Sequence, residues 1–233
     1  MASHLTRKEL KSDQVAVTVE HTVDYVQAHQ RPIIQIVVGV VALAVIIGGI
    51  VFYRSQQQEV RDARLAEAVK VAEAPVGAQG TPDAIAFPTN EAKAAEETKV
   101  FSKLQADYPG TMQAYIAEYY LAGVDASQAR LEEARKKYED VAKNGDTNTA
   151  SLAKFAVAQI LIQENKLSDA ESILKGLMDH PTDVVSKEQA TITLANAYKT
   201  TKPAEAKKLL EPLVKENGEI AGTAARILNE IPK

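Results

Sequence analysis

Histidines are the side chains of this chain best suited to acid–base catalysis and metal binding. The 233-residue sequence has four, His4, His21, His29 and His180. No two of them stand four residues apart, and His21-x-x-Asp24 alone is a poor metal site. Cysteine is absent, which excludes disulfides, thiol catalysis and cysteine-ligated metals. We therefore predict that the chain has no metal site.

No other group of residues is arranged for a chemical step. The sequence has no nucleophile turn with a serine, histidine and carboxylate, no glycine-rich phosphate loop and no His-Glu-x-x-His pair. His180 precedes Pro181, which favours an exposed position at a helix end. Glu171 and Lys175 have the spacing of an ion pair on a helix surface. We predict a protein that is not an enzyme and uses no cofactor.

One concentration of aromatic residues, Tyr115, Tyr119 and Tyr120, suggests packing or binding instead. At helical spacing these rings either fill the core between helices or line a groove that binds a peptide. The sequence leaves both possibilities open. The rival class of function is an enzyme with a site that crosses several helices, which would require histidines or carboxylates to converge inside such a groove.

The overall charge bears on the kind of partner. The chain has 27 lysines and arginines against 31 aspartates and glutamates, for a net charge of −4. Nucleic-acid binding requires a concentrated basic face. We therefore predict no nucleic-acid partner.

An apolar run from Ile33 to Phe52 is the strongest signal in the sequence. It contains no charged residue, and as a helix it would extend about 30 Å, the thickness of a bilayer's hydrocarbon core. We predict a transmembrane helix over residues 33–53, after a cytoplasmic tail with an amphipathic helix over residues 1–32. A cleaved signal peptide is disfavoured by the long leading segment. Charges flanking the run are balanced, and a short tail before an uncleaved span favours export of the larger part.

Helix signals continue after the predicted span. We expect a stalk helix over residues 54–74, a Pro/Gly-rich linker over 75–89 and a helical domain over 90–233. The fold class is therefore all-α. Helix starts are predicted at the capping boxes Ser168-x-x-Glu171 and Ser186-x-x-Gln189, and a stretched turn is expected at residues 123–126.

The helical domain repeats itself. Ala134, Ala170 and Ala206 are separated by 36 residues, and each is followed four and seven positions later by large apolar residues or a tyrosine. A small residue followed by large ones on one helix face indicates close helix crossing. Each of these helices follows another amphipathic helix, and Phe101 with Leu104 begins an earlier, degenerate copy.

Helix pairs of this length and pattern resemble tetratricopeptide (TPR) repeats, over about residues 90–231. The resemblance implies an α-solenoid of antiparallel helix pairs with a groove that binds protein partners. The groove residues it implies lie on the first helix of each pair: Glu118, Phe155, Gln159, Asn196 and Lys199.

The layout as a whole resembles the ancillary SecYEG translocon subunit family (YfgM-like). This resemblance implies a scaffold in the bacterial inner membrane with a periplasmic C-terminal domain. Its partners would be the Sec translocon and a periplasmic chaperone. An envelope-assembly or cell-division scaffold is the alternative within the same class of function.

Overall fold

The computed structural model describes residues 30–77, 85–215 and 218–232, and these divide between two compact units, 1–59 and 60–233. Helix α2 (Gln30–Glu73) supplies the described part of the first unit and the opening helix of the second. The amphipathic helix predicted in the tail lies outside the described residues, and so does the middle of the predicted linker.

The first part of α2 is long and apolar enough to cross a membrane. Its most apolar stretch has a mean hydropathy of 2.8, and none of that stretch is buried against the rest of the protein. Large side chains such as Val45 and Ile36 are therefore exposed. α2 is one continuous helix through both of the segments predicted as span and stalk.

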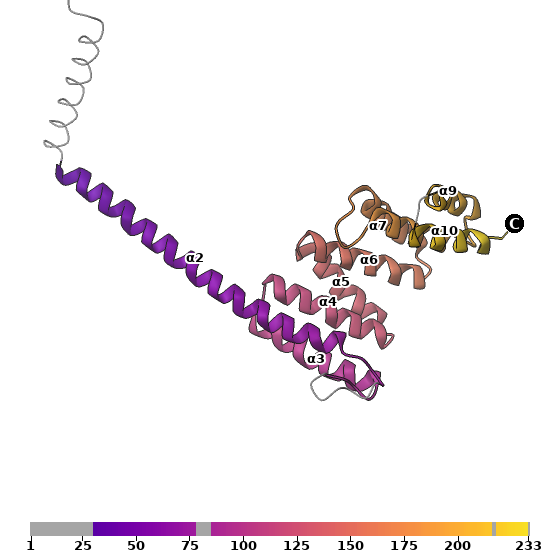
Figure 1. Cartoon of the computed structure of the whole chain (residues 1–233), viewed down its shortest axis with the longest axis horizontal. Coiled ribbons are helices and arrows are strands. Elements are labelled where there is room, and N and C mark those ends of the chain that lie inside the picture. The colour runs from indigo at the N-terminus through magenta and orange to yellow at the C-terminus, as the bar shows by residue number, and fades with distance from the viewer. Residues whose placement is uncertain (1–29, 78–84, 216–217, 233) are drawn as a thin grey trace, which may run out of the picture. The chain divides into compact units, whose positions relative to one another are not determined.

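The second unit consists of helices, and each described helix from α3 onward packs against the next (Figure 1). No strand forms in the described ranges, where the nearest equivalent is a single bridge between Val76 and Phe87. The all-α prediction is thus confirmed. The helices are α3 (Asn90–Asp107), α4 (Met112–Ser127), α5 (Leu131–Asn144), α6 (Thr147–Gln163), α7 (Leu167–Asp179), α8 (Lys187–Tyr198), α9 (Pro203–Val214) and α10 (Glu219–Glu230).

These helices form two layers. We call α4, α6, α8 and α10 the inner layer, because each also contacts the next member of that set. We call α5, α7 and α9 the outer layer, because no such contact joins them within the described chain. A solenoid whose inner helices lie closer together than its outer ones is concave on the inner side.

The outer layer confirms the predicted repeat. Ala134, Ala170 and Ala206 are each completely buried, as expected for residues at a close helix crossing. The larger residues four and seven positions later are buried as well: Tyr138 and Val141, Leu174 and Leu177, Leu210 and Leu213. In α3, Phe101 and Leu104 occupy the corresponding positions and are buried, although Glu97 stands where the later repeats have alanine.

Helix starts follow more than one mechanism, of which the sequence revealed one. Ser186 caps α8 by accepting a hydrogen bond from the Gln189 backbone N–H at 3.1 Å, so the helix start predicted here is confirmed. The box at Ser168 is wrong, because α7 begins at Leu167 and has no side-chain cap. Asn165 instead adopts a left-handed conformation, and the Lys166 N–H bonds back to the Leu161 carbonyl at 2.8 Å.

The turn between α4 and α5 has the same construction, with Ala129 in the left-handed conformation at φ 60. The stretched turn expected at residues 123–126 is therefore wrong, because α4 continues to Ser127. Gly123 lies inside that helix, where a Cβ atom would approach the Tyr138 hydroxyl to 3.4 Å.

The last part of α2 belongs to the core of the second unit, which the sequence analysis did not anticipate. Ala68 is buried with Phe101 and Leu104 of α3 in a small cluster that also contains residues of α4. The Gln113 amide of α4 donates a hydrogen bond to the Asp62 carboxylate of α2 at 2.6 Å. The end of α2 and α3 thus form the first helix pair of the solenoid.

Candidate functional site

A groove opens on the inner layer between α6, α8 and α10. Its volume of about 660 Å³ lies within the usual range of ligand-binding sites. Each of the three inner helices contributes part of its wall. We call it the inner groove, and its lining residues are Phe155, Gln159, Ser186, Gln189, Ile192, Thr193, Glu219, Ile220 and Thr223.

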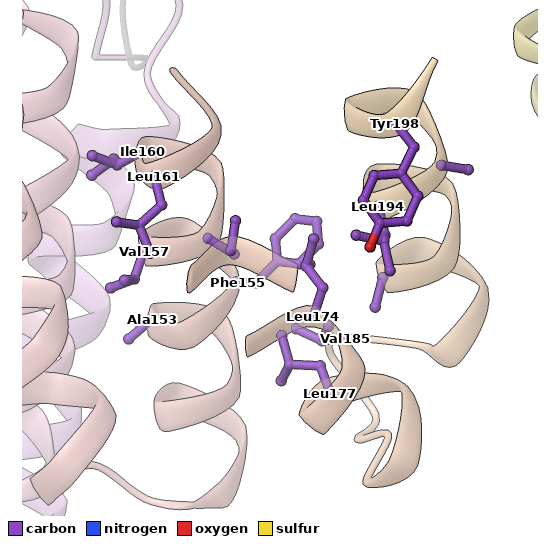
Figure 2. Packing of buried hydrophobic residues seen from close by; sticks show 14 of the residues in the cluster. Ala153, Phe155, Val157, Ile160, Leu161, Leu174, Leu177, Val185, Leu194 and Tyr198 are labelled. Carbon is purple, nitrogen blue, oxygen red and sulfur yellow. The ribbon is translucent and has the colours of Figure 1, made fainter. Parts of the chain in front are cut away.

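Phe155 forms the floor of the inner groove and also belongs to the core. Its side chain is 8% exposed and lies in the main hydrophobic cluster of the second unit. Figure 2 shows it extending from α6 toward Leu174 and Val185. The part that remains accessible faces the groove, where Ile192 and Ile220 provide the other apolar surfaces.

Uncharged polar groups make up most of the remaining lining. Gln159 and Gln189 are exposed, so their side-chain amides are available to a ligand. The Thr193 hydroxyl donates to the Gln189 carbonyl at 2.9 Å, which leaves its oxygen lone pairs to accept. An amide both donates and accepts hydrogen bonds, as does the backbone of a peptide. The inner groove is therefore chemically matched to a polypeptide chain.

Charge in the lining is restricted to one carboxylate. Glu219, in the first turn of α10, is exposed and is the sole ionisable group among the described residues that line the inner groove. Two cationic side chains near the C-terminal ends of α8 and α10 form ion pairs outside the groove. The Lys199 ammonium lies 2.8 Å from a Glu230 oxygen, and Arg226 lies 3.3 Å from the other oxygen.

The residues implied by the TPR resemblance are distributed unevenly. Phe155 and Gln159 line the inner groove together. Asn196 is exposed on α8 but does not line the groove, and Lys199 caps the end of α8 while paired with Glu230. The structure therefore brings two of these residues together and separates the others from them.

Glu118 lies away from the inner groove. It is half-buried on α4, and its charged neighbours are Asp140 and Lys137 of α5. Burial, with a further contribution from the nearby Asp140 carboxylate, raises the pKa of Glu118 above its ordinary value. The 36-residue repeat relates Glu118 on α4 to Lys154 on α6. Lys154 lies on the side of α6 that faces α5 and α7, so Glu118 is expected on the corresponding side of α4, away from the inner groove.

Two of the tyrosines left open by the sequence are packing residues. Tyr120 stacks on Phe101 with ring centroids 4.5 Å apart, and Tyr119 meets Tyr138 edge-on at 5.2 Å. Tyr119 and Tyr120 also touch each other at 5.9 Å. This chain of rings joins the small first cluster to the main core. Tyr115 is half-buried on the same helix.

Several groove residues were missed by the sequence analysis. An offset of 37 residues relates Phe155 to Ile192 and the buried Ala153 to Ala190, so a separate alignment of the first helices would have found Ile192. No such alignment identifies the three groove residues of α10, because this helix lies after the third copy of the repeat.

The described residues offer a surface for binding. Within ranges 30–77, 85–215 and 218–232, no cluster of three or more histidines, aspartates or glutamates is placed to hold a metal ion. His180 is exposed at the end of α7.

Comparison with known proteins agrees with this architecture. Neither the curated proteins nor the solved structures gave a match. The family described as "Tetratricopeptide repeat-like domain" matches residues 33–190, from the start of the apolar run to the first turn of α8. Such repeats typically present concave surfaces that bind other proteins. Because this match covers more than half of the sequence, the chain belongs to the tetratricopeptide repeat-like domain family.

Proposed function

We propose that this protein is a membrane-anchored, non-enzymatic scaffold whose inner groove binds a protein partner at the bacterial inner membrane. The observation that carries the proposal is the lining of the inner groove. Phe155 provides an apolar floor, and Gln159 and Gln189 provide exposed amides that can bond to a peptide backbone. Aromatic floors surrounded by polar groups are typical of the energetic centres of protein interfaces.

The apolar part of α2 is the proposed anchor. It is long enough to cross a bilayer, and its side chains lack partners in the described structure. An exposed apolar surface of this size is unfavourable in water, which supports insertion into lipid. The resemblance in layout to the ancillary translocon subunits implies that the second unit would face the periplasm.

The resemblance in layout to the ancillary translocon subunits supports a specific setting. The partner would be the Sec translocon or a periplasmic chaperone, and the protein would assist handover of exported chains between them. A domain tethered by α2 stays close to the membrane, where newly exported chains emerge. Asn196 would extend the binding surface along α8, since it lies seven residues after Gln189 and so on a similar face.

Site-specific crosslinking tests this proposal. A photoreactive amino acid placed at Gln159 or Thr193 in the full chain, in intact membranes, should crosslink to a subunit of the Sec channel or to a periplasmic chaperone. The same group at Lys208, exposed on α9 of the outer layer, is the matched control and should give no such product. Crosslinks confined to cell-division or envelope-assembly proteins would refute the translocon role. Equal products from Lys208 and Gln159 would refute the groove.

A further inference from the structure

The geometry points to a specific class of partner segment: an extended stretch of polypeptide with small apolar side chains and a lysine or arginine opposite Glu219. This inference rests on the proposed function, since it describes what the inner groove would select. It is carried by the apolar, hydrogen-bonding and charged groups of the groove.

The apolar surfaces of the inner groove are separate rather than continuous. Phe155 is on α6, Ile192 on α8 and Ile220 on α10, and Ile220 is 37% exposed. An extended chain turns alternate side chains to opposite sides. It can therefore place small apolar side chains against these separate surfaces while its backbone passes between them.

The hydrogen-bonding groups distinguish an extended segment from a helical one. A helix satisfies its own backbone groups internally, so it would leave the amides of Gln159 and Gln189 without backbone partners. An extended chain has unpaired N–H and C=O groups that require bonds when they leave water. Gln159 and Gln189 stand on two neighbouring helices that border the groove and can supply them.

The charge of the groove decides between basic and acidic segments. Glu219 is the sole ionisable group of the lining within the described chain, so a cation on the partner meets an opposite charge and a carboxylate meets a like charge. Lys187 follows Ser186 in α8 but does not line the groove. Lys199 and Arg226 are held by Glu230. The net charge of −4 also disfavours the approach of an acidic partner.

Selection from a random library tests this inference directly. Twelve-residue random peptides displayed on phage are panned against the full chain in lipid nanodiscs. Parallel selections use Glu219→Gln, Glu219→Lys and, as a matched control, Glu211→Lys. Glu211 is exposed on α9, outside the inner groove. Circular dichroism and melting curves confirm that each variant is folded before it is used.

The wild-type protein should enrich lysine and arginine over aspartate and glutamate by about fivefold at one position of the aligned peptides, the effect of a single partly exposed ion pair. Glu219→Gln should abolish that preference, Glu219→Lys should reverse it, and Glu211→Lys should leave it unchanged. Enrichment of acidic peptides by the wild type, an unchanged preference in Glu219→Lys, or no enriched peptide at all would overturn the inference.

The result of the peptide selection can be interpreted independently of the result of the crosslinking experiment. Partner crosslinks from Gln159 together with no charge preference in the selection would refute the inference and leave the scaffold function standing. A charge preference that responds to Glu219 without crosslinks in membranes would refute the scaffold function instead.

Discussion

The inner and outer layers bury their side chains in different ways. Each outer helix buries one face, with alanine and two larger residues at fixed spacing, as at Ala170, Leu174 and Leu177. Each inner helix contacts neighbours on several sides, so α6 buries residues that include Phe155, Val157 and Ile160. The outer layer therefore fixes the spacing of the repeats, whereas the inner layer must both pack and present a surface.

Because of this difference, we expect mutations that affect stability alone and mutations that affect binding to lie in different layers. Substitutions in the outer layer should affect stability alone. Substitutions on the groove side of the inner layer should affect binding, and only Phe155, which belongs to both the core and the groove, should affect the two together.

The largest expected effect is that of Phe155→Ala compared with Leu174→Ala. Both remove a buried side chain, so each should destabilise the full chain by about 3 kcal/mol, seen as a lower melting temperature in detergent. Only Phe155→Ala should also weaken recovery of the partner when binding is measured at a temperature where both variants are folded. Equal binding by the two variants would remove Phe155 from the site.

The second-largest effect is expected from a side chain that is too large for a close helix crossing in the outer layer. Ala170→Leu introduces a large side chain where Ala170 is completely buried, which should cost about 1–3 kcal/mol. Ala204→Leu on α9 is the matched control, because Ala204 is exposed and the change should be nearly neutral. Thermal melts of the two variants measure the difference, and an unchanged transition in Ala170→Leu would contradict the repeat alignment.

A stabilising change is expected at the turn between α4 and α5. Ala129 adopts φ 60, a conformation that strains residues with a Cβ atom. Ala129→Gly should relieve that strain and stabilise the protein by about 0.5–1 kcal/mol, after the added flexibility of the unfolded chain is deducted. The equivalent Asn165→Gly should give less, since asparagine already tolerates this region. A chemical denaturation series checks the order of these effects.

The smallest effect concerns an ionic contact between α7 and the turn before α9. Glu171 on α7 receives hydrogen bonds from Lys175 at 2.7 Å and from Lys202, in the turn before α9, at 2.9 Å. Bonds from Lys175, then from Tyr198 and Lys202, lower the pKa of Glu171 to about 2. Because the carboxylate is favoured in the folded state, its contribution is complete above the ordinary value of 4.5 and is lost as pH falls toward 2.

Glu171→Gln should therefore lower the melting temperature by about 2 °C or less at neutral pH. The gap between variant and wild type should close as the pH is lowered below 4.5. A gap that persists unchanged at acidic pH would show that the ionic contact contributes nothing.

The sequence predicted the outer layer well and the groove only in part. Each outer helix buries a single face with the same spacing of residues, so Ala134, Ala170 and Ala206 could be aligned from the sequence. Inner helices bury several faces at once, and their repeat differs by one residue between α6 and α8 because the connection from α7 is longer. Glu118 was assigned to the groove from the TPR resemblance, although its charged neighbours are on α5.

The sequence shows an apolar face on the last part of α2, which includes Leu65 and Ala72, but it does not show which helix covers that face. Ala68, which packs against Phe101 and Leu104, lies in a stretch rich in small and charged residues that resembles an exposed stalk. The packing becomes evident only when α3 is placed beside it. Left-handed turns at Ala129 and Asn165 were missed because neither position has the glycine that usually marks them.

The central claim is that the exposed positions on the two sides of α6 differ, because a partner covers the one in the inner groove and leaves the other open to water. Because the chain has no cysteine, single cysteines at Gln159 and Lys154 can be labelled without background. Gln159 lies in the inner groove, and Lys154 is exposed on the opposite side of α6.

The decisive measurement is the labelling rate of Gln159→Cys and Lys154→Cys by a membrane-impermeant maleimide in spheroplasts, compared with the purified protein in detergent. We predict that both positions react from the outer side of the membrane. We also predict that Gln159→Cys alone is protected in spheroplasts and regains full reactivity once purified. Equal rates at the two positions in both preparations, or no labelling of either in spheroplasts, would contradict the account.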